Sequence, residues 1–237
     1  MKRSLRYLIH SAPVILPALG VVLGSVGYYI NHNLPIKYEF QAWVVITIVL
    51  IFNGIVLGSI VRSLALRATL DSLTGLGNRG MFYLDLKNET HKYLKGAQSE
   101  FSLALIDVDN FKAVNDRYGH PAGDSVLRQL ASIFENSIRV SDAVVRWGGE
   151  EFAIILSNTG HDGAVAFLER IRGIVEKHDF GPEVQSQPIT VSVGVVSLKD
   201  LKLKKDENEI ESDVVEFADK ALYQAKITKN CVIAYGH

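Results

Sequence analysis

Cysteine is almost missing from this 237-residue chain, which contains Cys231 and no other. A single cysteine excludes an internal disulfide and fits a protein that faces a reducing compartment. An excess of positive charge is missing as well, since the formal net charge is −1. The first 62 residues hold five basic residues and one acid, or +4, so the rest of the chain carries −5. An acidic body of this kind does not attract phosphate backbones, and we expect no nucleic-acid partner.

Charged side chains are missing from two long stretches, Tyr7–Ile36 and Phe40–Val61. Each stretch reaches the roughly 20 apolar residues that are needed to cross the hydrocarbon core of a bilayer. The whole chain is 48% hydrophobic, which also favours a membrane part. We therefore expect residues 1–62 to form a transmembrane hairpin, with helices at about 7–30 and 40–61.

Basic residues lie on the outer side of both stretches (Lys2, Arg3, Arg6, Arg62 and Arg67). By the positive-inside rule both ends of the hairpin then face the cytoplasm. The alternative for the first stretch is a cleaved signal peptide, but the stretch is long for one and has no convincing Ala-x-Ala site. Residues 63–70 contain good helix formers and predict a helical linker, either a plain tether or a short dimerising stalk.

Residues 71–237 have the length of one ordinary domain and contain no repeats. The pattern of apolar and turn residues predicts helices at 78–94, 164–177 and 214–228, a further helix that starts near Pro121, and strands at 101–107, 143–147, 152–156, 189–196 and 232–235. Gly148-Gly149 between two of these strands indicates a hairpin. The charged segment 201–211 is predicted to be a solvated loop. The alternation of helices and strands favours an α/β (α+β) sandwich with a mixed sheet.

Three carboxylates lie next to predicted strands: Asp107 ends one strand, and Glu150 and Glu151 follow the Gly-Gly turn. If the two strands are neighbours in one sheet, these acids meet at one edge and repel one another, because no basic partner is evident nearby in the sequence. A divalent cation relieves that repulsion, and oxygen-only ligands select Mg²⁺ or Mn²⁺. Two such ions suit the attack of a hydroxyl group on an α-phosphate. The alternative is an exposed acidic hairpin tip.

The segment Phe111–Asp124 is rich in polar and turn-forming residues. An Asn and an Asp can together recognise guanine, since the amide donates and accepts while the carboxylate accepts from N–H groups. Lys112 can contact a phosphate group. Taken alone, the segment is most simply a loop with helix caps.

Several motifs follow one another in residues 68–237: Asp71–Arg79 (DSLTGLGNR), Ile106–Lys112 (IDVDNFK), Asn115-Asp116, Gly119-His120, Gly123-Asp124 and Arg146–Phe152 (RWGGEEF). In order and spacing they resemble the GGDEF domain of diguanylate cyclases, in its GGEEF variant. The resemblance implies a ferredoxin-like nucleotidyl-cyclase palm with a mixed central sheet, preceded here by two predicted transmembrane helices. It also implies the condensation of two GTP molecules into cyclic di-GMP and two pyrophosphates.

The resemblance also implies roles for individual positions. Two Mg²⁺ ions per active site would bind Asp107, the Val108 carbonyl, Glu150 and Glu151, and Glu150 would be the base for the ribose 3′-hydroxyl. Lys112 would stabilise charge on the phosphates, and Lys226 would contact the triphosphate. Asn115 and Asp124 would bind guanine, with His120 near the nucleotide. Arg139 and Asp142 match the RxxD site of product inhibition, with help from Arg170 of a neighbouring domain. The alternative for Arg139 and Asp142 is a surface ion pair.

Each such domain holds one GTP, so the resemblance implies a homodimer, and we expect it in the inner membrane of a bacterium, in contact with membrane lipid.

One departure concerns the family ending AKxxGRN, which is AKITKNC here, at Ala225–Cys231. The Gly-Arg pair is missing or shortened, and Lys229 is a weaker substitute for the Arg, which bears on nucleotide affinity. The rival functions are a catalytically silent, membrane-bound receptor for cyclic di-GMP and a scaffold that localises a partner protein.

Overall fold

The computed structural model of the chain describes residues 24–25, 27–29, 32, 36–96, 100–184, 188–201 and 207–236. Contacts divide the chain into two compact units, Met1–Leu64 and Ala65–His237. The first predicted membrane helix, at about 7–30, lies mostly outside the described residues.

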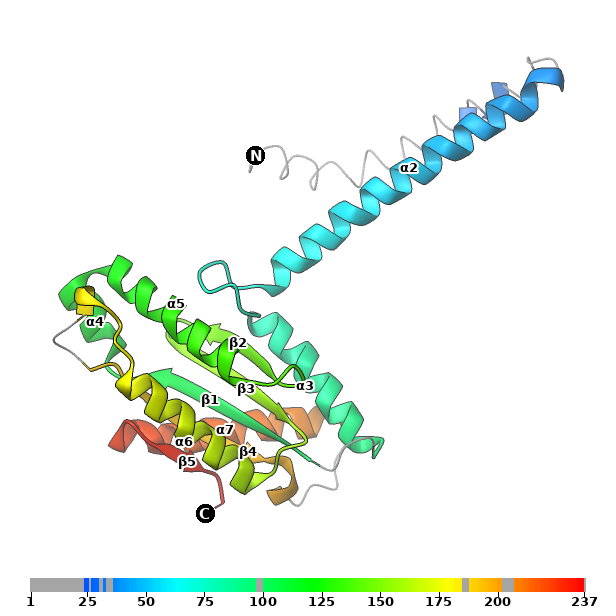
Figure 1. The fold of residues 1–237 in the computed structure, drawn as a ribbon. Coiled ribbons are helices and arrows are strands. Elements are labelled where there is room, and N and C mark those ends of the chain that lie inside the picture. Colours follow the sequence, from blue (N-terminus) through cyan, green and yellow to red (C-terminus); the bar gives the residue numbers. More distant parts are fainter. Residues whose placement is uncertain are drawn as a thin grey trace. The chain divides into compact units, whose positions relative to one another are not determined.

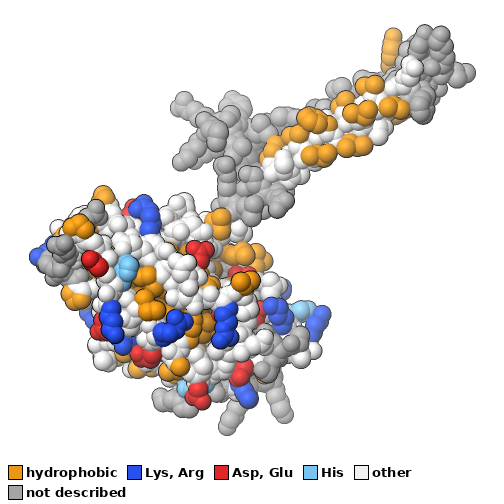
Figure 2. Space-filling model, viewed as in Figure 1, with side chains coloured by type: hydrophobic (Ala, Val, Ile, Leu, Met, Phe, Trp, Pro, Cys, Tyr) orange, Lys and Arg blue, Asp and Glu red, His pale blue; other side chains and the backbone are white. Residues whose placement is uncertain are grey.

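Helix α2 (Ile36–Thr69) contains the candidate membrane-spanning segment Trp43–Ile60, whose mean hydropathy is 2.4 and none of which is buried. Figure 2 shows hydrophobic side chains along the surface of this helix. The few polar side chains in the segment bond to their own helix, as when the Thr47 hydroxyl donates to the Trp43 carbonyl at 2.8 Å and the Asn53 amide to the Val49 carbonyl at 2.8 Å. Hydrocarbon offers no other partner for such groups. Within the described part of the chain, α2 is the one helix long and apolar enough to cross a membrane.

The second unit is built on a five-stranded sheet in the order β2-β3-β1-β4-β5. Its strands are β1 (Phe101–Val108), β2 (Ala143–Gly148), β3 (Glu151–Ser157), β4 (Val191–Ser197) and β5 (Val232–Ala234). The central strand β1 pairs antiparallel with both β3 and β4, whereas β4 and β5 are parallel. The sheet is therefore mixed, as predicted.

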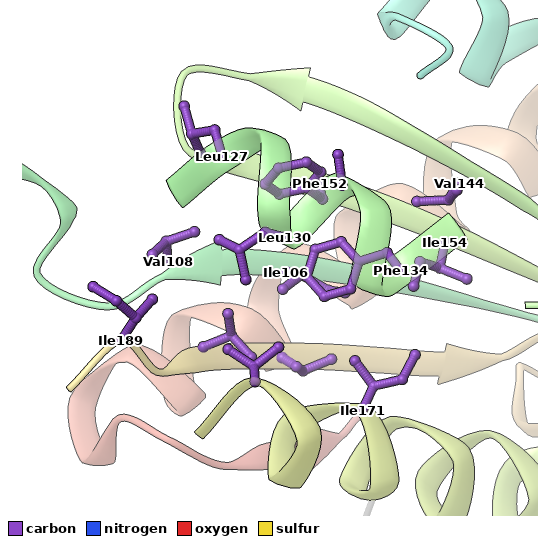
Figure 3. Close-up of a cluster of buried hydrophobic side chains, with 14 of the residues drawn as sticks. Ile106, Val108, Leu127, Leu130, Phe134, Val144, Phe152, Ile154, Ile171 and Ile189 are labelled. Carbon is purple, nitrogen blue, oxygen red and sulfur yellow. The ribbon is translucent and has the colours of Figure 1, made fainter. Parts of the chain in front are cut away.

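Helices cover both faces of the sheet (Figure 1), with α5 and α6 on one face and α3 and α7 on the other. The helices of this unit are α3 (Arg79–Leu94), α4 (Phe111–Tyr118), α5 (His120–Ser137), α6 (His161–Lys177) and α7 (Glu207–Thr228). Because both faces are covered, β1 is buried along almost its whole length. Figure 3 shows the core between the sheet and the first pair of helices, where Phe134 packs edge-on against Phe152 at 5.1 Å between ring centres.

Local sequence explains where several elements begin. The Asn78 side chain caps α3 by accepting from the backbone N–H groups of Gly80 and Met81. Pro121 lies in the first turn of α5, where its missing N–H costs nothing. Gly194 in β4 has no room for a side chain, because the backbone of α7 at Leu222 and Ala218 lies directly against it. This close approach fixes the path of α7 across the sheet, toward the end at which Asp107 lies.

Two elements differ from the sequence-based prediction. Residues 111–118, interpreted as loop, form α4, because Phe111 and Val114 share one buried face of a short helix. Helix α7 begins at Glu207 rather than near 214, so the predicted loop at 201–211 is wrong over 207–211. The many charged residues of this segment led to the loop prediction, but Ile210 and Val214 lie one helical turn apart and are both buried.

Candidate active site

Antiparallel pairing brings three carboxylates to one edge of the sheet. Asp107, near the end of β1, lies opposite Glu151 at the start of β3. The Val108 N–H donates to the Glu150 carbonyl at 3.3 Å, which places Glu150 beside them. The tight turn between β2 and β3 requires a left-handed residue, and Gly149 supplies it with φ of 52°. The expected meeting of these acids is thus present in the backbone register.

A lysine from a distant part of the sequence lies among these acids. The Lys226 ammonium is 2.8 Å from the Asp107 carboxylate and 3.9 Å from that of Glu151. The acids have no basic partner nearby in the sequence, but the fold supplies one from far along the chain. The partner comes from the end of α7, and no inspection of neighbouring sequence could find it.

The electrostatics of this edge combine burial with mutual repulsion. Burial raises the pKa of Asp107, the Lys226 ammonium lowers it, and the charges of Glu150 and Asp109 raise it, with a net increase. Burial likewise raises the pKa of Glu151, against the effect of Lys226. Partial burial lowers the pKa of Lys226, but the hydrogen bond and charge of Asp107 outweigh it, and the net pKa is raised. The edge thus holds more negative charge than one ammonium neutralises.

The donor set of this edge fits a hard divalent cation. Its ligands are carboxylate and carbonyl oxygens, the class that Mg²⁺ and Mn²⁺ prefer. In the described part of the chain, no three acid, histidine or cysteine side chains are already grouped closely enough to hold a metal ion. The carboxylates and the Lys226 ammonium therefore need to rearrange before the acids could converge on a metal.

Asp109 is a buried acid for which sequence analysis predicts no role. Its carboxylate accepts from the Thr190 hydroxyl at 2.7 Å, the Ser192 hydroxyl at 2.6 Å and the Asn230 N–H at 3.0 Å. It connects the loop after β1 to the turn after α7, which is the segment that departs from the family ending. In that turn the Lys229 ammonium lies 2.6 Å from the Asn110 side-chain oxygen, at the start of α4. The one signal in the sequence was the position of Asp109 inside the IDVDNFK motif.

The predicted nucleotide-binding residues lie on α4 and the first turn of α5. Lys112 is exposed on α4, and the Asn115 side chain lies directly against Gly123. This contact brings Asn115 next to the helical turn that carries Asp124. His120 is exposed at the start of α5. The packing of α4 on α5 thus places Asn115 against the residue that precedes Asp124.

The predicted RxxD segment is a turn between α5 and β2. The Asp142 carboxylate accepts from the Arg139 N–H at 3.0 Å, the Ser157 N–H at 3.2 Å and the Ser141 hydroxyl at 3.3 Å. The Arg139 side chain is exposed. Arg170 of the same chain donates from α6 to the Ser137 carbonyl at 3.4 Å, close to this turn. The Asp142 carboxylate thus closes the turn, while the Arg139 guanidinium faces solvent.

The loop before α3 is attached to the hairpin that carries Glu150. The Arg146 guanidinium donates to the Gly149 carbonyl at 2.9 and 2.6 Å and to the Asp71 carboxylate at 3.0 Å. Arg79 stacks over the Trp147 ring at 4.5 Å. These residues line a pocket of about 500 Å³ beside the Gly-Gly turn.

Comparison with protein families decides the classification. Residues 68–231 match the family described as "Diguanylate cyclase, GGDEF domain", which is more than half of the chain. The chain belongs to the GGDEF family. Diguanylate cyclase A of Treponema denticola is 39% identical over 163 residues, which cover 67% of this GGDEF protein and 42% of the relative. An uncharacterized membrane protein of Staphylococcus saprophyticus is 38% identical over 159 residues, covering 66% of this chain and 42% of the relative.

Solved structures agree with this classification of the fold. The coiled coil and GGDEF domain of DgcB from Caulobacter crescentus, in complex with c-di-GMP, superimposes with a TM-score of 0.68 at 29% identity, covering 83% of this chain and 99% of that one. The active GGEEF domain of a diguanylate cyclase from Vibrio cholerae gives a TM-score of 0.61 at 34% identity, covering 68% and 99%. The present GGDEF protein therefore has the palm fold of the family. It spans less than half the length of the two curated relatives above.

Proposed function

We propose that this GGDEF protein is a diguanylate cyclase, which condenses two GTP molecules into cyclic di-GMP with release of two pyrophosphates. The observation that carries the proposal is the meeting of Asp107, Glu150 and Glu151 at one sheet edge, beside Lys226. Relatives named as diguanylate cyclases share about two fifths of their sequence with this domain where they align. The site combines acids for metal binding with residues suited to a purine nucleotide.

The chemistry assigns one task to each group of residues. Asp107, Glu150, Glu151 and the Val108 carbonyl would hold two Mg²⁺ or Mn²⁺ ions, which supply charge neutralisation at the α-phosphate and a more acidic 3′-hydroxyl. Asn115 and Asp124 bind the guanine edge, with His120 near the nucleotide. Lys112 stabilises charge on the phosphates, and Lys226 leaves the carboxylates to contact the triphosphate.

Bond formation occurs twice per product. Glu150 accepts the proton of the ribose 3′-hydroxyl, whose oxygen attacks the α-phosphorus of the second GTP. The new bond joins O3′ to the α-phosphorus, and the bond to the bridging oxygen of the β-phosphate breaks, so pyrophosphate leaves. The 3′-hydroxyl of the second nucleotide then attacks the α-phosphorus of the first in the same way, which releases the second pyrophosphate and closes the ring. Because each domain holds one GTP, the active species is a homodimer.

The remaining parts of the chain serve attachment and control. We assign residues 1–62 to a two-helix anchor in the inner membrane, 63–70 to a helical linker and 71–237 to the cyclase domain in the cytoplasm. Support comes from the apolar segment of α2 and from relatives that are named as membrane proteins. Arg139, Asp142 and Arg170 form a product-inhibition site, where guanidinium groups bind phosphates and Asp142 accepts from guanine.

The test is synthesis by the detergent-solubilised full-length protein, incubated with GTP and Mg²⁺ and analysed for cyclic di-GMP by chromatography. We expect product from the wild type and none from Glu150→Gln, while Glu150→Gln still binds added cyclic di-GMP. Glu216→Gln, which removes an exposed carboxylate from α7, is the matched control and retains activity. Absence of product from the wild type, after bound nucleotide is removed, would instead support the silent receptor.

A further inference from the structure

Ser157, the last residue of β3, contacts both residues that close the RxxD turn. Its backbone N–H donates to the Asp142 carboxylate at 3.2 Å, and its hydroxyl oxygen lies 2.7 Å from the Ser141 carbonyl. Ser157 is buried, and the pairing of β3 with β1 fixes its backbone opposite Phe101. One strand residue therefore binds the last two residues of this turn, Ser141 and Asp142.

Ser157 is in turn fixed by an acid from another helix. Glu89 of α3 is 5% exposed, and one of its carboxylate oxygens lies 2.8 Å from the Ser157 hydroxyl. The other oxygen accepts from the Lys92 ammonium at 2.5 Å. Burial of a carboxylate is costly unless it has partners. Glu89 is therefore bound to a defined position, and it orients the Ser157 side chain.

A hydroxyl group has a single proton, whereas the Ser157 hydroxyl lies within hydrogen-bond distance of two acceptors. The carboxylate and the Ser141 carbonyl thus share that proton. The position of α3 consequently affects how firmly the Ser141 carbonyl, and with it the turn, is bound to β3. No such connection is visible in the sequence, where the three residues are 52 and 16 positions apart.

We propose that Ser157 is a positioning residue of the product-inhibition site, which it serves by fixing the turn that presents Arg139 and Asp142, and that Glu89 competes with this turn for the Ser157 proton. The proposal rests on the proposed function of that turn. Release of the Ser141 carbonyl would let the turn adopt other conformations, and product binding would then include the entropy of ordering it. Catalysis is not expected to change, because Ser157 lies at the opposite end of β3 from Glu151, about 20 Å away at the usual rise per strand residue.

The experiment compares variants of the solubilised full-length protein by the inhibition constant of cyclic di-GMP in initial-rate assays. Ser157→Ala should raise that constant about three- to tenfold, the effect of one lost hydrogen bond. Glu89→Leu removes the competing acceptor and leaves the Ser157 proton to the Ser141 carbonyl, so it should lower that constant or leave it unchanged. Their kcat and KM for GTP should stay at wild-type values. Glu89→Gln keeps an acceptor for the hydroxyl and should retain most of the inhibition. Thr159→Val is the matched control, since it deletes a hydroxyl that bonds to the Ser157 carbonyl without touching the turn.

Arg139→Ala separates this proposal from the function on which it rests. If Arg139→Ala abolishes inhibition but Ser157→Ala leaves the inhibition constant unchanged, the positioning role is wrong and the product site stands. If Arg139→Ala has no effect, both assignments are wrong. Should Glu89→Leu fail to fold, Ser157→Ala decides alone, because it removes a single oxygen atom.

Discussion

The Lys226 ammonium partly neutralises the active-site edge in the absence of other cations. It lies 2.8 Å from Asp107, which is largely buried, and it is the cation nearest to Glu151 in the described structure. A tethered ammonium and a divalent cation compete for the same carboxylate oxygens, since each gains by neutralising them. Metal binding without nucleotide is therefore weakened by this lysine.

We predict that Lys226→Met increases the stabilisation of the protein by Mg²⁺. Without the ammonium, the acids repel one another more strongly, and Mg²⁺ should raise the melting temperature further than it does in the wild type. The measurement is thermal unfolding across a Mg²⁺ titration in the absence of GTP. Lys220→Met is the control, because Lys220 pairs with Glu216 on the exposed side of the same helix. If Mg²⁺ raises the melting temperature equally in the wild type and both variants, Lys226 does not compete with Mg²⁺ for the carboxylates.

The turn after α7 combines unusual backbone geometry with a position near the predicted phosphate-binding residues. Lys229 and Asn230 have φ angles of 61° and 47°, a region that glycine adopts more easily. The Arg172 guanidinium donates to the Asn230 side chain at 2.8 Å, and the Asn230 N–H donates to Asp109. These bonds compensate for the absent glycine of the family ending. The ammonium of Lys229 is thereby placed at the start of α4.

The loop before α3 and the β2–β3 hairpin behave as one structural element because Arg146 bonds to both. Burial alone raises the pKa of Asp71, but the Thr74 hydroxyl and N–H and the Arg146 guanidinium lower it below the ordinary value of 3.8. An acid whose pKa is lowered on folding stabilises the fold above its unfolded pKa. That contribution is lost as the pH falls through the lowered, folded-state pKa.

We predict that Asp71→Asn lowers the free energy of unfolding at pH 7 by about 1–3 kcal/mol, the usual range for hydrogen bonds to a charged group. The difference between the variant and the wild type should shrink as the pH falls below about 4, where the wild-type carboxylate takes up a proton. Urea unfolding of both proteins at pH 7 and pH 3 measures the two differences. A gap that is the same at both pH values would show that Asp71 acts through packing instead of charge.

The sequence predicted the elements whose periodicity is strong and missed those that depend on distant contacts. The central strand at Phe101–Val108 and the hairpin at Gly148-Gly149 could be predicted, because an apolar run and a Gly-Gly turn are local signals. Helix α4 has eight residues, half of them polar or charged, so its burial against α5 decides its structure. The Lys226–Asp107 pair and the Ser157–Glu89 contact join elements far apart in the chain, and only the folded structure brings them together.

At the scale of the whole molecule, the chain combines an apolar helix with a domain that has its own hydrophobic cores on both faces of the sheet. The reaction proposed here needs two such domains, because each supplies one GTP. Attachment of both partners to one membrane raises their effective concentration without any new contact. A membrane anchor would therefore affect activity by raising the rate at which two domains meet, as well as by setting their location.

We predict that the isolated unit 65–237 has a specific activity that rises with its own concentration. While dimers are a minority, doubling the enzyme should quadruple the rate, since active pairs form in proportion to the square of the domain concentration. The full-length protein in lipid vesicles, compared at the same domain concentrations and a fixed ratio of protein to lipid, should show nearly constant specific activity. Initial rates of cyclic di-GMP formation over about a hundredfold dilution measure both dependences. Constant specific activity of the isolated unit would mean that it dimerises tightly without the membrane. The anchor would then only determine where the enzyme is located and would not promote dimerisation.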